Sequence, residues 1–264
     1  MRNKLLLGLA LLAALPAAAD DLDKIKAKGE VVIGVRENSP PFGFFDKKRG
    51  VVFGYDIEFA NYVAKKLGVK PVFKTLEPAE RLPAIKDGRV DLVFASLAKT
   101  SEREKEVDFS LGYFISTQKM LAKKGKFRNL TQLDNMRVCV PKGTTNAKLL
   151  QGVSSSVQVI NMDDYDDTLK GLAEGKCDGA SGPEATMLGN LAKMPGKQDY
   201  EVADIAIASE ALAVGMRKGE KKLQKAVNEA LVDAEATGEA ARIFNTWFGP
   251  GSNVPLIRAF RIVY

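Results

Sequence analysis

The chain of 264 residues carries 39 basic and 33 acidic side chains, two cysteines and no histidine, for a formal net charge of +6 at pH 7. Without histidine it lacks the commonest general base and the commonest metal ligand, which argues against hydrolase triads and zinc sites and predicts neither metal nor cofactor. The charge surplus is small and the basic run at 123–126 has no interleaved aromatic residues, so nucleic acid is not an expected partner.

The first twenty residues have the pattern of a secretory signal peptide. Arg2 and Lys4 precede an apolar run at 5–15, and the small-residue site 17–19 follows it. Such a run is too short to span a bilayer and is typical of a cleaved leader. We predict a signal peptide over 1–19, no lipid anchor, since no cysteine lies near the cleavage site, and a mature protein located in the periplasm.

The first half of the mature chain alternates strand and helix patterns. Short apolar runs predict strands over 31–35, 51–53, 72–76 and 90–95, and the segment 36–46 is expected to be a loop because Pro40, Pro41 and Gly43 interrupt it. Apolar residues at helical spacing predict a helix capped by Asp56 and running to 67, and a second helix over 81–87 that ends at Gly88.

The segment 96–110 follows a predicted buried strand and contains a helix-start signal. Ser101 and Glu104 have the spacing of a capping box, which places Arg103 in the first turn of a short helix beyond the strand end. Ligands bind at strand ends in open α/β sheets, and a guanidinium there is suited to a carboxylate. The alternative is that Arg103 pairs with Glu106 or Asp108 on a solvated face.

The second half repeats this alternation and ends in helices. Strands are predicted over 136–140, 157–160, from Cys177 and over 211–216, and the predicted helices are 146–150, 164–174, 220–237 and 239–248. This order is typical of α/β proteins whose parallel sheets carry helices on both faces. The tail at 253–260 is expected to be extended.

Two segments in the two halves match in their details. In each, a helix ends at a glycine, Gly88 or Gly175, and an aspartate follows three residues later. The same count places Ser96 and Pro183 at corresponding strand ends. The match indicates two similar lobes whose strand ends face one cleft.

The two cysteines are too few and too far apart in the sequence for a structural zinc site. In an oxidising compartment a lone pair of cysteines is expected to form a disulfide. Because Cys139 and Cys177 both fall at predicted strand starts in the same half, we predict that they are bonded to each other.

The succession of motifs resembles the polar amino-acid family (family 3) of periplasmic solute-binding proteins, which serve ABC importers. The matching segments occur in the family's order over nearly all of the mature chain: GVRENSPPFGFFD, GYDIEFANYVAKKLG, LPAIKDGRVDLVFASL, TSEREKEVDFSLGYF, PKGTTNAKLL, LAEGKCDG and AARIFNTWFG. Each segment is weak evidence alone, and their succession is specific.

The resemblance implies a type II, periplasmic-binding-protein-like fold of two α/β lobes joined by two hinge strands. The first lobe would comprise 20–114 and 213–264, the second 119–207, with hinges near 115–118 and 208–212. In such proteins the ligand closes the lobes, and the closed form docks on a membrane permease. A monomer is expected.

Residue by residue, the resemblance implies a carboxylate site. Arg103 matches the arginine that holds the ligand's α-carboxylate, and Ser96 and the backbone of Ala98 assist it. Thr145, which follows Thr144 at the head of a second-lobe helix, matches the threonine that completes the site; the alternative is an ordinary N-cap, and the two roles are compatible. A helix N-terminus offers spare N–H donors to an anion.

Within the family the chain looks most like the glutamate/aspartate branch, which carries arginines at Arg36 and Arg81. Two positions depart from it: Pro183 stands where the family has its ammonium-binding aspartate, and Tyr165 aligns with a branch histidine. Glu184 is therefore a hypothetical ammonium partner, and the alternative is a solvent-facing residue at a helix start.

The sequence thus predicts a binding protein, not an enzyme, for an acidic or polar amino acid that it delivers to a permease. A binder of a non-amino dicarboxylate is one alternative. Another is a cyclohexadienyl dehydratase-like enzyme of the same fold with Glu184 as general acid, and a third is a sensory receptor domain.

Overall fold

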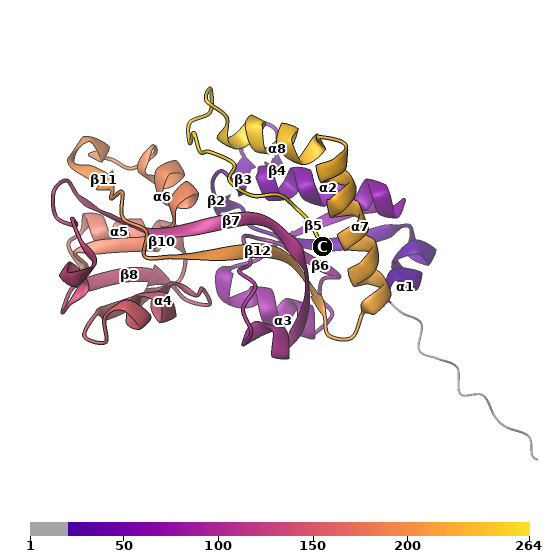
Figure 1. The fold of residues 1–264 in the computed structure, drawn as a ribbon, viewed down its shortest axis with the longest axis horizontal. Coiled ribbons are helices and arrows are strands. Elements are labelled where there is room, and N and C mark those ends of the chain that lie inside the picture. The colour runs from indigo at the N-terminus through magenta and orange to yellow at the C-terminus, as the bar shows by residue number, and fades with distance from the viewer. Residues whose placement is uncertain (1–20) are drawn as a thin grey trace, which may run out of the picture.

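The computed structural model describes residues 21–264, which form two lobes connected by two long strands (Figure 1). The predicted signal peptide lies outside these residues. None of the helices within 21–264 has both the length and the apolar character needed to cross a membrane.

The first lobe is built on the parallel strands β5, β1 and β6, in that order. Helices α2, α7 and α8 cover one face of this sheet and α3 packs on the other. Its elements are α1 (Asp21–Lys28), β1 (Glu30–Val35), β2 (Asn38–Ser39), β3 (Gly43–Asp46), β4 (Val51–Phe53), α2 (Tyr55–Leu67), β5 (Lys70–Thr75), η1 (Pro78–Glu80), α3 (Arg81–Lys86), β6 (Leu92–Phe94), η2 (Arg103–Lys105), α7 (Lys221–Ala236) and α8 (Glu239–Phe248).

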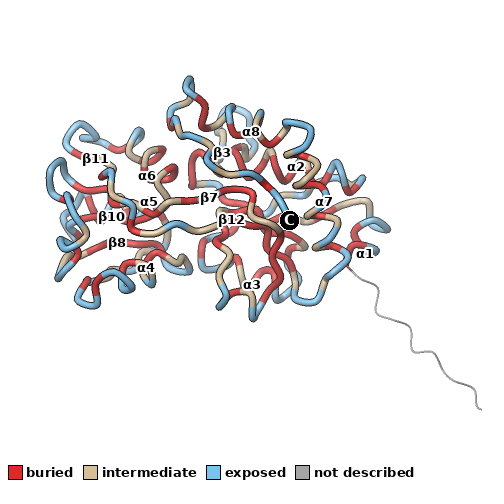
Figure 2. Tube along the Cα trace, in the orientation of Figure 1, coloured by how far each residue is buried: buried red, intermediate tan, exposed pale blue. Residues whose placement is uncertain are grey.

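The second lobe is built on the parallel strands β10, β8 and β9. Its sheet lies between two apolar clusters, as the first lobe's sheet does, and buried segments lie inside both lobes (Figure 2). Its elements are η3 (Leu130–Leu133), β8 (Arg137–Pro141), α4 (Asn146–Val153), β9 (Gln158–Met162), α5 (Tyr165–Ala173), β10 (Gly179–Pro183), α6 (Glu184–Leu191), η4 (Lys197–Asp199) and β11 (Tyr200–Val202).

Strands β7 (Val107–Lys123) and β12 (Ala208–Arg217) pair antiparallel and extend from one lobe into the other (Figure 1). They link the two parallel sheets into one hydrogen-bonded path of order β5-β1-β6-β12-β7-β10-β8-β9. The expected hinge segments 115–118 and 208–212 lie on these two strands and are paired with each other. Any movement between the lobes therefore has to bend or twist this ribbon.

The internal match between the halves is confirmed in three dimensions. Asp91 accepts a hydrogen bond from the backbone N–H of Val32, at 2.7 Å, and Asp178 accepts the corresponding one from Arg137, at 3.2 Å. In both lobes the aspartate thus ties the start of one parallel strand to its neighbour. The helix before it ends at a glycine with positive φ, 67° at Gly88 and 74° at position 175.

The predicted disulfide is confirmed: Cys139 and Cys177 are bonded, with their α-carbons 5.8 Å apart. Cys139 lies in β8, and Cys177 precedes β10, the strand that pairs with β8. Both cysteines are buried in one apolar cluster of the second lobe.

Two local predictions are wrong. The segment 36–46 was expected to be a loop, but β2 and β3 form in it and pair with β4 in a separate small sheet. Asp56 does not cap α2, whose N-cap is Gly54; the aspartate lies in the first turn and its carboxylate points into the protein interior, fully buried.

Candidate functional site

A small polar cavity lies where the two lobes meet, with a volume of about 30 Å³. Seven of the eight predicted ligand residues line it together: Arg36, Arg81, Ser96, Ala98, Arg103, Thr144 and Thr145. About 30 Å³ is one water molecule's share of liquid volume, so accommodating an amino acid requires the lobes or the lining side chains to move apart.

Arg103 is buried, with 9% of its surface exposed, and its guanidinium reaches across the cleft. Nη1 donates to the carbonyl of Ala98 at 2.9 Å, and Nη2 donates to the carbonyl of Gly143 in the second lobe, also at 2.9 Å. Burial lowers the pKa of Arg103, against the field of Glu210, which raises it. The guanidinium remains a cation at neutral pH and is positioned for a carboxylate.

The local environment of Arg103 differs from the predicted capping box. The hydroxyl that accepts the backbone N–H of Arg103 belongs to Thr100, at 3.2 Å, and the turn is the short 3₁₀ helix η2. The solvated-face alternative is also wrong, because Glu106 pairs with Lys86 and Asp108 with Lys221.

Ser96 occupies the end of β6 with φ of 49°, a left-handed conformation that is costly for a residue other than glycine. The carboxylate of Asp56 holds it there, accepting from its backbone N–H at 2.8 Å and from its hydroxyl at 3.2 Å. Tyr113 donates to the other oxygen of Asp56 at 2.7 Å. Burial raises the pKa of Asp56 to about 6, although these hydrogen bonds oppose the shift.

We expect Asp56 to make the protein's stability pH-dependent between pH 4 and 6. A carboxyl whose pKa is higher in the folded than in the unfolded state contributes stability below its unfolded pKa, and this contribution is lost as the pH rises through the folded value. With 3.8 and about 6 as the two values, wild type should lose about 3 kcal/mol relative to Asp56→Asn over this range. Urea unfolding at pH 4, 5, 6 and 7 measures the difference, Asp163→Asn controls for loss of an exposed carboxylate, and parallel profiles would contradict the expectation.

Arg81 lines the cavity, but its guanidinium is engaged by backbone. Its nitrogens donate to the carbonyls of Pro78, Ala95 and Ser96 in the first lobe, at 2.9 to 3.1 Å, and to Gly143 across the cleft at 3.0 Å. Burial, together with the neighbouring cations Arg103 and Arg36, lowers the pKa of Arg81 to about 9. Its first effect is to fix the strand end that presents Ser96.

Arg36, which follows β1 directly, is 2% exposed and forms an ion pair with Glu77. Its Nη1 lies 3.0 Å from a carboxylate oxygen of Glu77, and it also bonds to the side chain of Asn38. Asn38 in turn donates to Asp164 of the second lobe at 2.8 Å. The Nε of Arg36 is buried and has no hydrogen-bond partner among the described residues, so this side chain retains one unused donor.

The head of α4 supplies the second lobe's contribution. Thr145 occupies the N-cap position but its hydroxyl makes no capping bond; it donates to Glu210 on β12, at 2.5 Å. The hydroxyl of Thr144 donates to the carbonyl of Pro141 at 2.7 Å. Thr145 is therefore the N-cap residue by position, but its hydroxyl contacts a carboxylate instead of capping the helix.

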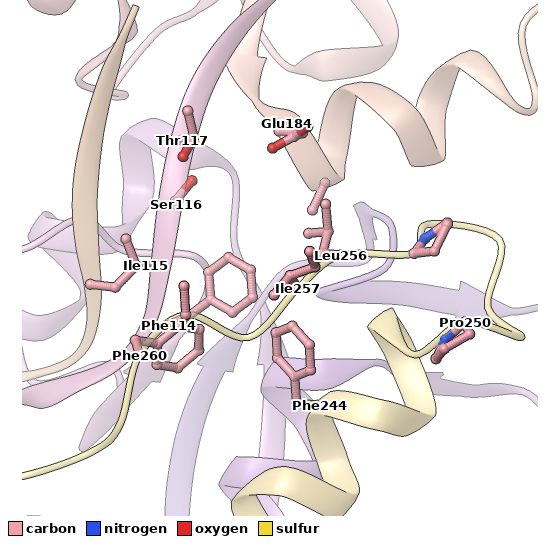
Figure 3. A pocket seen from close by; sticks show the side chains of 13 residues that line it. Phe114, Ile115, Ser116, Thr117, Glu184, Phe244, Pro250, Leu256, Ile257 and Phe260 are labelled. Carbon is pink, nitrogen blue, oxygen red and sulfur yellow. The ribbon is translucent and has the colours of Figure 1, made fainter. Parts of the chain in front are cut away.

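Glu184 does not lie in the cleft. It begins α6, and its carboxylate lies 2.7 Å from Nζ of Lys119. It lines a different cavity, of about 530 Å³, formed with β7 and the C-terminal tail, which includes Phe114 and Leu256 (Figure 3). Because Pro183 starts the helix turn immediately before it, the side chain at 184 is directed to the tail side of β7.

Several residues lining the cleft cavity were not assigned to the site from the sequence. Glu210 lies on β12, Ser116 on β7, Asn146 on α4 and Thr186 on α6. Glu210 falls one position before the strand predicted at 211–216, and it had no motif to mark it. No group of three histidine, cysteine, aspartate or glutamate side chains within 21–264 is placed to hold a metal ion.

The lobes touch where two glycines allow backbone to meet backbone. Gly143, with φ of 71°, lies so near η1 that a β-carbon on it would be 2.4 Å from the α-carbon of Ala79. On α6, a β-carbon at Gly189 would be 2.7 Å from the carbonyl oxygen of Pro40. Both contacts join one lobe to the other, and no larger residue fits either of them without a shift.

Two α/β lobes, two paired strands that connect them and a polar cavity between strand ends define the class of two-lobed, type II solute-binding proteins. The profile of the bacterial extracellular solute-binding proteins, family 3, matches residues 31–250. The chain belongs to this family.

Known relatives extend over most of this chain. The glutamate/aspartate import solute-binding protein of Escherichia coli K12 is 29% identical over 247 residues, which cover 89% of this chain and 82% of the relative. A glutamine-binding protein of Geobacillus stearothermophilus is 31% identical over 216 residues, covering 80% and 81%. The solved structure of an ancestral arginine-binding protein bound to glutamine superposes with a TM-score of 0.78 at 32% identity, covering 84% and 98%.

Proposed function

We propose that this protein captures an amino acid with a side-chain carboxylate in the periplasm and delivers it to the permease of an ABC importer. Its family membership supports the coarser part, amino-acid binding for ABC transport. The observation that carries the acidic substrate is the gathering of Arg36, Arg81 and Arg103 at one small cavity. An unpaired buried cation is costly, and a ligand with two carboxylates would compensate more of this charge than a neutral amino acid.

The proposed division of labour follows from the partners of each arginine. Arg103 has both a first-lobe and a second-lobe carbonyl as acceptors, so a ligand carboxylate placed there would contact both sides of the cleft. Arg36 lies at the first-lobe side and keeps an unbonded Nε. We assign the α-carboxylate to Arg103, with Ser96, Ala98 and Thr145 around it, and the side-chain carboxylate to Arg36.

Closure of the lobes would convert ligand binding into a signal for the permease. The hinges proposed at 115–118 and 208–212 lie in the middle of β7 and in the first half of β12, where the two strands pair. The closed arrangement is stabilised by contacts between lobes, such as Asn38 with Asp164 and Glu102 with Lys148, at 2.8 and 2.5 Å. A ligand shifts the population of closed protein in proportion to its preference for that form.

The named relatives are binding proteins of transport systems, and this protein is likewise a binding protein and not an enzyme. A dehydratase would need a general acid directed into the cleft, and Glu184, the predicted candidate for it, pairs with Lys119 outside that cavity.

A thermal-shift screen tests the substrate class. At 100 times its Kd a ligand adds about 2.7 kcal/mol to the free energy of unfolding, which for a protein of this size is a shift of about 5–10 °C. We expect L-glutamate or L-aspartate to give the largest shift among the amino acids, cystine and deaminated dicarboxylates. A larger shift with glutamine, cystine or arginine would reject the acidic substrate while leaving amino-acid binding intact.

A further inference from the structure

The ligand's positive charge needs a partner, and the cavity contains one candidate. We propose that Glu210, on the hinge strand β12, binds the α-ammonium group of the ligand. The assignment depends on the proposed function, since it supposes that the ligand is an amino acid.

The position of Glu210 suits this role. It pairs in register with Ser116 of β7, and both residues line the cleft cavity. Its carboxylate accepts the hydroxyl of Thr145 at 2.5 Å, which keeps it directed at the head of α4. It is only partly buried, so an ammonium group can reach its carboxylate.

The charges of the residues that line the cavity also support Glu210 as the partner of the ammonium group. Glu210 is the one carboxylate among the described residues that line it, against the three guanidiniums of Arg36, Arg81 and Arg103. The ammonium group of a bound amino acid would therefore contact Glu210 on β12, and its carboxylates would contact the arginines of the first lobe. The field of Glu210 is already felt by Arg103, since it raises the pKa of that guanidinium.

Other carboxylates near the cleft have different partners. Asp56 is fully buried behind Ser96 and is held by Tyr113 as well. Asp164 accepts from Asn38 and from the backbone of α5. Glu184 pairs with Lys119 and lines the cavity beside the C-terminal tail (Figure 3).

A residue on the strands that connect the lobes is expected to stay near the ligand in both the open and the closed form. Hinge strands bend, so a residue on them moves less than a residue at the rim of either lobe when the cleft opens. Glu210 would thus be available to the ammonium group in the open form as well as in the closed one. The first recognition of an amino acid would occur at the hinge, and the arginines would engage as the lobes close.

Calorimetry on Glu210→Gln tests the proposal, with the L-amino acid that gives the largest thermal shift and its deaminated analogue, such as glutarate for L-glutamate. Glutamine has nearly the same shape and can still accept from Thr145, so the fold should be retained. We expect at least a 30-fold loss of affinity for the amino acid, and less than a threefold change for the deaminated analogue. The matched control, Glu184→Gln, should bind both as wild type does.

Three results would overturn the assignment. Glu210→Gln could bind the amino acid as wild type does, it could weaken or strengthen the amino acid and its analogue equally, or the wild type could bind only deaminated dicarboxylates. A gain for both ligands would mean that Glu210 competes with a ligand carboxylate for Thr145. If the tightest ligand proves to be a neutral amino acid and Glu210→Gln still weakens it selectively, the proposal of an acidic substrate is rejected and the ammonium-binding role of Glu210 is retained.

Discussion

Replacing Arg103 with alanine is expected to abolish binding of every amino acid that this protein takes. The guanidinium is buried at the cleft and bonds to carbonyls of both lobes, so its removal takes away the carboxylate's partner and a contact between lobes. Loss of one partner of a buried charge pair costs about 2–5 kcal/mol, or about 30-fold to several thousand-fold in Kd. Calorimetry measures the loss, and Arg103→Lys should give an intermediate one because an ammonium cannot bind a carboxylate bidentately.

Arg36→Ala is the companion variant that separates the two carboxylates. If Arg36 holds the side-chain carboxylate, its removal weakens L-glutamate strongly and L-glutamine little, whereas Arg103→Ala weakens both. Thermal unfolding of each variant without ligand shows whether the fold is intact. Equal weakening of glutamate and glutamine by Arg36→Ala would contradict the proposed division, and retention of glutamate binding by Arg103→Ala would contradict the site itself.

Removal of the disulfide should have the largest effect on stability. The bond between Cys139 and Cys177 closes a loop with a sequence separation of 38, which on the chain-entropy model stabilises the folded state by about 4 kcal/mol. Urea unfolding of Cys139→Ser with Cys177→Ser measures the loss, and reduced wild type is the control that keeps both side chains in place. Because the bond lies in the second lobe's core and neither cysteine lines the cleft cavity, ligand affinity at low temperature should change little.

A loss below about 1 kcal/mol in both the double serine variant and the reduced protein would contradict this expectation. If only the serine variant were destabilised, the cause would be the burial of two hydroxyl groups and not the loss of the cross-link.

The elements that the sequence predicted well are those with local signals. Helices α3 and α5 end at glycines with positive φ, and the aspartates that follow tie neighbouring strands in both lobes. Strand β7 has no such signal. Its buried polar residues Ser110 and Gln118 make hydrogen bonds to residues 104 and 63 positions away in the chain, and their presence interrupts the apolar pattern that a buried strand normally shows.

The site divides in the same way. Arg103, Thr145 and Ser96 follow strand ends or precede helices, and the resemblance to the family matched them to one carboxylate site. Glu210 reaches the cavity only because β12 crosses between the lobes beside β7. Glu184 was misplaced because one position along a strand-to-helix turn decides which side of β7 a side chain faces.

The two glycine contacts between the lobes separate the residues that determine ligand specificity from those that determine the shape of the closed protein. At Gly143 and Gly189 the closed lobes meet through backbone atoms, and Gly143, Ala79, Gly189 and Pro40 do not themselves line the cavity. Substitutions among the cavity residues other than Arg81 and Arg103, which bond to the carbonyl of Gly143, can therefore change the preferred amino acid while the outer shape of the closed protein stays the same. A permease that recognises the closed form by its outer shape would accept a binding protein with a new substrate. The substrate delivered to the importer could then change through substitutions in the binding protein alone.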